Sequence, residues 1–103
     1  MIIRFDLDGI IAEDTGGWSP EEYADAKPNK KTIALMRRCV DEGIVVIIYT
    51  SRLSEETFAI TLDWLTKNKV PYSQIHFDKP FYTYCLDDRN ITLEQLEEIL
   101  DKR

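Results

Sequence analysis

The chain has 103 residues and a formal net charge of −6, with 44% hydrophobic and 31% charged residues. This length and composition predict a single domain over residues 1–103 with one hydrophobic core. The acidic balance argues against a broad nucleic-acid footprint, and no apolar run approaches the roughly 20 residues that span a bilayer. Because Arg4 and Asp6 interrupt the first apolar residues, we expect no signal peptide and a cytoplasmic protein.

The first half of the chain predicts two strands, one helix and a long connection. Residues 2–5 form a short apolar run that indicates a buried strand. Residues 10–29 lack periodicity and hold two glycines and two prolines, so we expect an irregular flap. Asn29 is a candidate N-cap for a helix over residues 30–42. The β-branched run at residues 44–49 predicts a strand covered on both faces, as in parallel sheets.

The second half predicts two helices and two more strands. Ser54 can cap a helix that ends at residue 67, and the spacing of Thr92 and Gln95 fits a capping box for the last helix. Residues 74–77 and 81–86 are predicted strands. We therefore expect an α/β fold: a three-layer, Rossmann-like parallel sheet of about four strands flanked by helices.

The two cysteines and the single histidine do not suggest a metal site. Cys39 falls in a helical pattern and Cys85 in the fourth predicted strand, and no CxxC motif is present. We expect two reduced thiols in the core. His76 has no neighbouring His or Cys, so we expect a structural or surface histidine.

Polar residues follow each predicted strand where it ends. They are Asp6 and Asp8 after the first strand, Thr50, Ser51 and Arg52 after the second, Lys79 after the third, and Asp87 and Asp88 after the fourth. Right-handed crossovers bring the carboxyl ends of parallel strands to one edge of the sheet, where ligands bind. The sequence therefore predicts one site with four carboxylates, a hydroxyl and an ammonium group.

This set of side chains suits phosphoryl chemistry. Mg²⁺ takes oxygen ligands, which Asp6 and one carboxylate of the last pair can supply. Asp6 is a candidate nucleophile, and Asp8 a candidate general acid and base. The hydroxyl of Thr50 and the backbone N–H groups after it can hold phosphate oxygens, while Lys79 neutralises charge. Gly9 permits a close approach of the backbone to the ligand.

Four other residues near the predicted site could contact the substrate, and three of them also have a structural interpretation. Ser51 and Arg52 are candidate substrate contacts, although Arg52 also fits a solvated arginine at the start of a helix. Trp18 and Tyr23 are either flap residues that contact the substrate or anchors that hold the flap on the core.

The four polar segments resemble, in order, the motifs of the haloacid dehalogenase (HAD) superfamily of phosphohydrolases. The segments are Asp6-Leu7-Asp8-Gly9, Thr50 after the second strand, Lys79-Pro80, and Asp87-Asp88. They span residues 6–88, nearly the whole chain. One departure is Ile10, where the family usually has Thr or Val.

The resemblance implies a Mg²⁺-dependent phosphatase that forms an aspartyl-phosphate. Asp6 would be the nucleophile and a metal ligand, and Asp8 the acid/base that also binds the metal through its backbone carbonyl. Thr50 and Lys79 would bind the phosphoryl group. Asp88 is the first choice for the remaining metal ligand, with Asp87 close behind.

A narrower resemblance involves three short segments. Val70-Pro71-Tyr72, Lys79-Pro80-Phe81 and residues 87–91 are similar to short, capless members associated with capsular polysaccharide biosynthesis. Only the flap is available to cover the site. A site this open suits a bulky phosphorylated substrate, or closure by a second subunit in a homo-oligomer.

Two alternatives belong to other functional classes. A receiver-like signalling module also has an acidic pair, a later Thr and a Lys-Pro, but it needs a phospho-accepting Asp at the strand end before that Thr. No such residue precedes Thr50 here. The other alternative is a non-catalytic binding subunit with the same fold, against which the intact motif residues argue.

Overall fold

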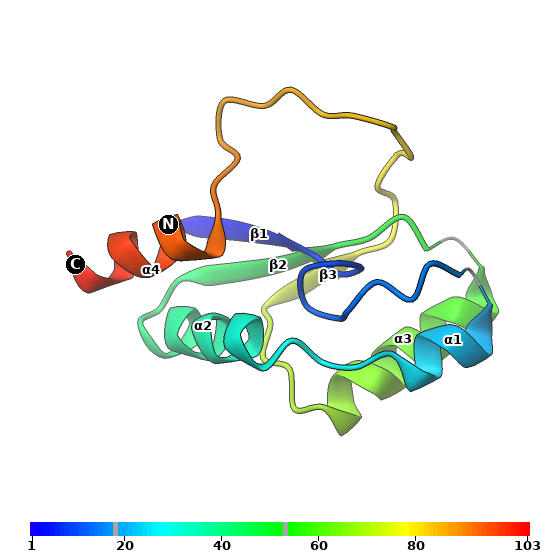
Figure 1. Ribbon diagram of the computed structural model, residues 1–103. Helices are drawn as coiled ribbons and strands as arrows, with labels where there is room; N and C mark the ends of the chain where they lie inside the picture. Colours follow the sequence, from blue (N-terminus) through cyan, green and yellow to red (C-terminus); the bar gives the residue numbers. More distant parts are fainter. Residues whose placement is uncertain (18, 53) are drawn as a thin grey trace.

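The computed structural model describes residues 1–17, 19–52 and 54–103, and Trp18 therefore lies outside the described residues. The elements in chain order are β1 (Ile2–Asp6), α1 (Pro20–Asp25), α2 (Lys30–Asp41), β2 (Val45–Tyr49), α3 (Glu55–Lys67), β3 (Gln74–His76) and α4 (Leu93–Asp101). The three strands form one parallel sheet in the order β1-β2-β3 (Figure 1). The predicted α/β class is confirmed.

Three helices begin where the sequence predicts, because side chains there satisfy exposed backbone N–H groups. Asn29 caps α2 by accepting the N–H of the third residue after it. Ser54 and Thr92 each form a complete capping box at the start of α3 and α4. The helix α1 is different, since the sequence predicted only an irregular flap there. Ser19 caps it and Pro20 occupies its first turn.

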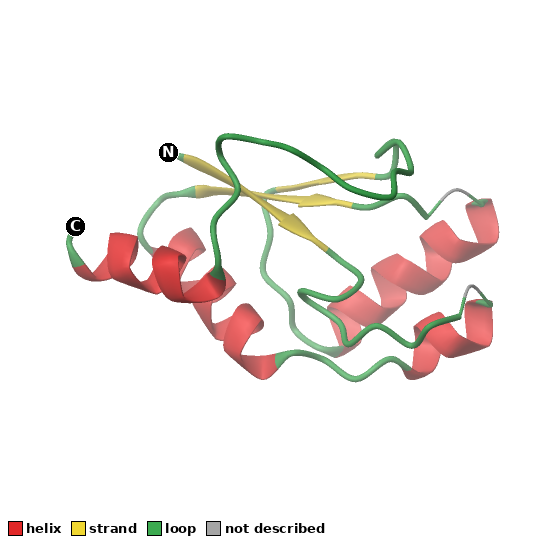
Figure 2. Ribbon diagram, turned by 45° about the horizontal axis from the view of Figure 1, so that its top comes forward, coloured by secondary structure: helices red, strands yellow, loops and turns green. Residues whose placement is uncertain are grey.

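The sheet is covered by helices on one face, which corrects the three-layer prediction. In β2, Val46 and Ile48 are fully buried, whereas the alternate residues Val45 and Ile47 are half-buried. Figure 2 shows the helices gathered on the same side of the strands. With strand order β1-β2-β3, right-handed crossovers through α2 and α3 must both lie on one face. The second face therefore lacks a helical layer in the described part of the chain.

The fourth strand was predicted wrongly, and the described residues form a sheet of three strands rather than about four. Residues 81–86 are exposed and lie in a long connection that arcs away from the sheet on the side opposite the helices (Figures 1 and 2). Tyr84, Cys85 and Leu86 all face solvent, so only Cys39 of the two cysteines is buried. Aromatic and β-branched residues favour a strand only where a partner strand pairs with them.

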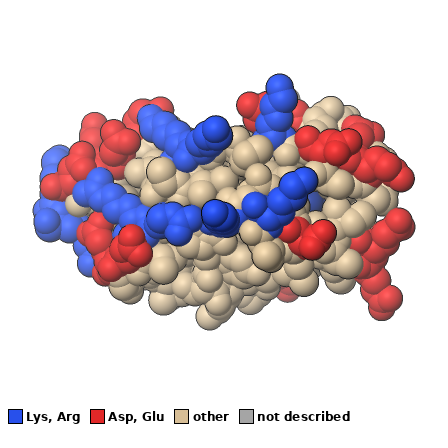
Figure 3. All heavy atoms as spheres, turned by 90° about the horizontal axis from the view of Figure 1, so that it is seen from below, with Lys and Arg blue, Asp and Glu red and all other residues tan. Residues whose placement is uncertain are grey.

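The molecular surface has an uneven distribution of charge. In the view from below, Lys and Arg side chains form a band across the middle of the molecule, with Asp and Glu side chains toward both ends (Figure 3). The net charge of −6 is thus not spread evenly. Among the described residues, no helix combines the length and apolar character that a membrane crossing requires.

Candidate functional site

An open pocket of about 370 Å³ lies at the carboxyl ends of the strands, a volume in the range of small-ligand sites. Asp6 and Asp8 reach it from the end of β1, Ser51 and Arg52 from the end of β2, and Lys79 from the segment after β3. The predicted meeting of the first three strand ends is therefore present in the structure. The pocket has further walls that the sequence did not indicate, including Asp14, Phe81 and Tyr82.

Lys79 and Asp6 form an ion pair in this pocket. The Lys79 Nζ lies 3.2 Å from Asp6 Oδ1, which also accepts the backbone N–H of Leu7 at 2.9 Å. The backbone N–H of Lys79 donates to the carbonyl of Thr50, which ties the lysine to the end of β2. Burial lowers the pKa of Lys79, but the charge of Asp6 and hydrogen bonds to Tyr82 and Asp6 outweigh it, and the net pKa is raised. Lys79 therefore remains an ammonium group at neutral pH.

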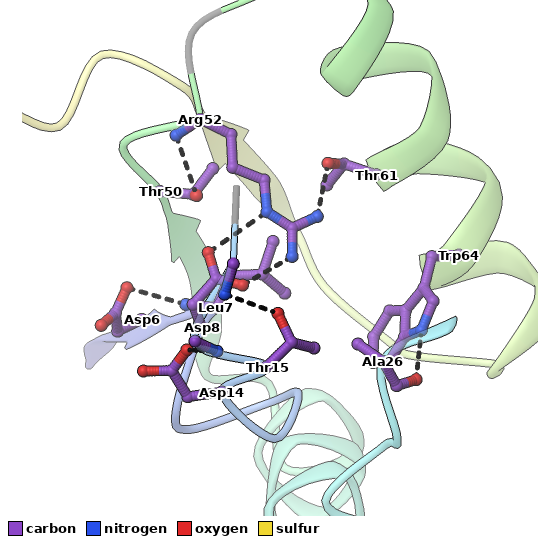
Figure 4. A network of polar contacts seen from close by, with 12 residues as sticks. Asp6, Leu7, Asp8, Asp14, Thr15, Ala26, Thr50, Arg52, Thr61 and Trp64 are labelled. Carbon is purple, nitrogen blue, oxygen red and sulfur yellow. Dashed lines mark hydrogen bonds and ion pairs between the residues drawn. The ribbon is translucent and has the colours of Figure 1, made fainter. Parts of the chain in front are cut away.

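Asp8 is held by Arg52, as Figure 4 shows. The Nη2 of Arg52 lies 2.6 Å from Asp8 Oδ1, and its Nε donates to Asp8 Oδ2 at 3.2 Å. The third nitrogen, Nη1, donates to Thr61 Oγ1 on α3 at 2.8 Å. With only 4% of its surface exposed, Arg52 is not the solvated helix-start arginine that the sequence left open.

The sequence did not indicate the contacts that bury Arg52. The Tyr23 ring of α1 stacks on the guanidinium, with 3.8 Å between the ring centroid and Arg52 Cζ. Burial raises the pKa of the Tyr23 phenol, the charge of Asp8 raises it further, and Arg52 opposes both. Thr61 is one of the buried residues of α3. The sequence does not show whether a buried threonine only packs in the core or also accepts a hydrogen bond from an arginine.

The flap is anchored to the body of the protein by two aromatic side chains. Tyr23 is buried, and α1 packs along α3. The indole Nε1–H of Trp64 in α3 donates to the carbonyl of Ala26, directly after α1, at 2.9 Å (Figure 4). Of the two interpretations of Tyr23, the structure therefore supports the anchor, although the side chain also lines the pocket.

Thr50 and Gly9 lie beside the pocket rather than in its walls, as far as the described chain shows. Thr50 is 1% exposed, and its Oγ1 accepts the backbone N–H of Arg52 at 3.3 Å. The neighbour of Thr50, Ser51, lines the pocket and brings a hydroxyl group to its wall. Gly9 has a φ of 91° and donates its N–H to the carbonyl of Ala12, so its freedom from a side chain serves the turn after β1.

Asp87 and Asp88 are not brought together with the other site residues. Both are exposed in the connection before α4, and Asp87 Oδ1 accepts the backbone N–H of Arg89 at 2.8 Å. Neither lines the pocket. His76 is also exposed, and its ring contacts the side chain of Gln74.

The pocket meets the needs of a magnesium ion only in part. Within residues 1–17, 19–52 and 54–103, no three His, Cys, Asp or Glu side chains cluster closely enough to hold one metal ion. Asp6 offers a carboxylate. Both side-chain oxygens of Asp8 are bonded to Arg52, so Asp8 could contribute only the backbone carbonyl that the sequence resemblance assigns to the metal. Mg²⁺ usually binds one or two carboxylates together with water and substrate phosphate, so Asp6 supplies the first carboxylate of such a set and the second, which the sequence assigns to Asp88 or Asp87, lies outside the pocket.

One solved structure supports the fold. No protein-family model matches this chain, and no curated protein matches it. The chain is similar to the crystal structure of a structural-genomics target from Vibrio cholerae, with 24% identity, a TM-score of 0.79, and coverage of 98% of this chain and 97% of that one. At this identity the likeness establishes the fold of the whole described chain and nothing about its chemistry.

Proposed function

We propose that this chain is a HAD-type phosphatase, which hydrolyses a phosphomonoester in a Mg²⁺-dependent reaction through an aspartyl-phosphate. The observation that carries the proposal is the meeting of Asp6, Asp8 and Lys79 in one pocket, although more than 70 residues separate the two aspartates from the lysine. The motif order along the chain supports the same assignment.

In the first step, Asp6 attacks the phosphorus atom of the substrate. Because Asp6 Oδ1 accepts two hydrogen bonds from the protein, we assign the attack to Oδ2. A bond forms between Oδ2 and phosphorus, and the ester P–O bond breaks. Asp8 enters this step as a protonated carboxyl group and donates its proton to the leaving oxygen, which leaves the carboxylate that Arg52 stabilises. The ammonium group of Lys79 lies beside Asp6 and stabilises the negative charge on the phosphoryl oxygens.

In the second step, water hydrolyses the aspartyl-phosphate. Asp8 removes a proton from the water, the water oxygen bonds to phosphorus, and the bond to Asp6 breaks to release inorganic phosphate. Ser51, in the loop after β2, holds the phosphoryl oxygens together with Lys79. Thr50 supports this loop from below, since its hydroxyl accepts the N–H of Arg52.

We include Mg²⁺ in the proposal because it would neutralise negative charge on the substrate phosphate while the Asp6 carboxylate approaches. Asp6 and the backbone carbonyl of Asp8 would hold it, together with the substrate phosphate and water. Asp88 or Asp87, which the sequence resemblance assigns to the metal, would join only if the connection before α4 moved to the pocket.

We infer the class of substrate from two properties of the pocket: it is open, and aromatic side chains stand at its rim. Phe81 and Tyr82, two exposed aromatic side chains, line the same pocket as Asp6. We propose that they contact the group that carries the phosphate, and that this group is bulky. The narrower sequence resemblance favours a sugar phosphate or a polysaccharide-linked phosphoester.

The direct test is hydrolysis of p-nitrophenyl phosphate with and without Mg²⁺. We expect Mg²⁺-dependent turnover by the wild type, no turnover by Asp6→Asn, and a loss of about 10²–10⁴-fold for Asp8→Asn. Asp25→Asn, an exposed carboxylate of α1, is the matched control and should retain full activity. Equal turnover by wild type and Asp6→Asn would remove Asp6 as the nucleophile. A panel of sugar phosphates and nucleotides then defines the substrate.

The position of Asp87 and Asp88 favours one alternative, a non-catalytic binding subunit. If those carboxylates stay outside the pocket, the remaining groups can still hold a phosphate through Lys79 and Ser51. Calorimetric binding of inorganic phosphate without hydrolysis of any phosphoester in the panel would support this alternative. In that case Lys79→Ala should abolish binding.

A further inference from the structure

We propose that Arg52 is a positioning residue for Asp8 and not a contact for the substrate phosphate. This inference rests on the proposed function, because it assigns a role to a second side chain of the same pocket. By its position after β2, Arg52 is a candidate substrate contact from the sequence alone.

The three nitrogens of the Arg52 guanidinium are already engaged by the protein. Two donate to the two oxygens of Asp8 and the third donates to Thr61. A planar guanidinium that bonds a carboxylate through two parallel N–H groups fixes the rotation of the carboxylate as well as its position. These three bonds use three of the five N–H groups of the guanidinium. The other two belong to a side chain that is only 3% exposed, so a phosphate could reach them only if Asp8, Thr61 or Tyr23 moved aside. The geometry therefore favours a role exerted through Asp8.

Three separate elements hold the guanidinium in place. Thr61 contacts it from α3, and Asp8 meets it from the turn after β1 (Figure 4). Tyr23 covers its face from α1. The side chain of Arg52 is 3% exposed, whereas that of Asp8 is 35% exposed and faces the pocket. The buried arginine thus presents the carboxylate of Asp8 to the pocket at a fixed angle. Because a proton transfer group must lie within hydrogen-bond reach of the reacting oxygen, this angle controls the rate.

The same arrangement connects the flap to the reaction. Tyr23 belongs to α1, and α1 is tied to α3 through Trp64 and Ala26. The helix α1 therefore completes the burial of Arg52. A more mobile α1 would hold Arg52, and through it the Asp8 carboxylate, less firmly in position. We assign to the flap a second role beside covering the pocket, namely support of the proton donor.

The test is a double-mutant cycle between Asp8 and Arg52, measured as kcat and KM for p-nitrophenyl phosphate. We expect Arg52→Ala to lower kcat about 10²-fold, the scale of a misplaced catalytic group, while KM stays within about twofold. Guanidinium ion at millimolar concentration should restore part of kcat. In the Asp8→Asn background, Arg52→Ala should cost little more, because the group on which it acts is gone.

Further variants separate positioning from folding. Arg52→Lys keeps the charge but cannot bond both oxygens, so we expect an intermediate kcat. Thr61→Val removes only the third contact and should lower kcat several-fold. Arg37→Ala, an exposed arginine of α2, is the matched control and should have no effect. Far-UV circular dichroism confirms that each variant is folded.

The outcomes distinguish the inference from the function on which it rests. A rise in KM with unchanged kcat, or an equal loss in the wild-type and Asp8→Asn backgrounds, would show that Arg52 binds substrate and would overturn the inference alone. An inactive wild type would overturn the proposed function and the inference with it. Non-additive losses in kcat, together with rescue by guanidinium, would establish the positioning role.

Discussion

The hydrogen bond from the Trp64 indole to the Ala26 carbonyl should contribute measurably to the free energy of unfolding, because it anchors the flap. Trp64→Phe keeps an aromatic ring in the core but removes the indole N–H, so the buried carbonyl of Ala26 loses its donor. Ala26 is 7% exposed and Trp64 is 4% exposed, so water has little access to this carbonyl. An unsatisfied buried polar group costs about 1–3 kcal/mol. The smaller ring removes apolar contact worth about 1 kcal/mol more.

We therefore expect Trp64→Phe to lower the free energy of unfolding by about 2–4 kcal/mol, a large part of the roughly 5–15 kcal/mol of a typical domain. Urea unfolding followed by circular dichroism measures this change, and the midpoint should fall by about 1–2 M. Asp63→Asn alters the exposed neighbour of Trp64 and should shift the midpoint little.

A second measurement locates the effect in the flap. Glu21 and Glu22 are exposed in α1, so a glutamate-specific protease should cleave there faster in Trp64→Phe than in the wild type. A loss below about 0.5 kcal/mol, with unchanged cleavage at these two residues, would refute the argument that this hydrogen bond anchors the flap.

Two further predictions follow from the burial of single side chains. An aromatic disulfide reagent should label the exposed Cys85 of the native protein within minutes and leave Cys39 unmodified. Cys39 is buried, and its burial, followed by the charge of Glu42, raises the pKa of its thiol. Cys85→Ser should abolish native labelling, and protection of Cys85 in the wild type would contradict the exposed connection. The raised pKa of Tyr23 predicts a phenol that ionises above the ordinary pKa of tyrosine in a titration at 295 nm, and Tyr23→Phe should remove this late component. Since the folded state keeps this proton longer than the unfolded state, the contribution of Tyr23 to stability is complete below pH about 10 and is lost as the pH rises further.

The sequence by itself determined the local structure and the order of the chemical groups. The caps at Asn29, Ser54 and Thr92 depend on residues within one helical turn, so they can be recognised without knowledge of the fold. The first three strands and the meeting of Asp6 with Lys79 also followed, because parallel strands joined by right-handed crossovers end at one edge.

Only the tertiary structure decided which of these groups share the pocket and what surrounds them. Residues 81–86 have the composition of a strand, but a strand requires a partner edge, and without one this segment stays exposed and leaves Asp88 outside the pocket. The sheet is covered on one face because both crossovers run in the same direction along it, a consequence of strand order that composition does not reveal. Arg52 became a buried partner of Asp8 because α1 and α3 meet around it, and such contacts between distant elements depend on packing rather than on any local pattern.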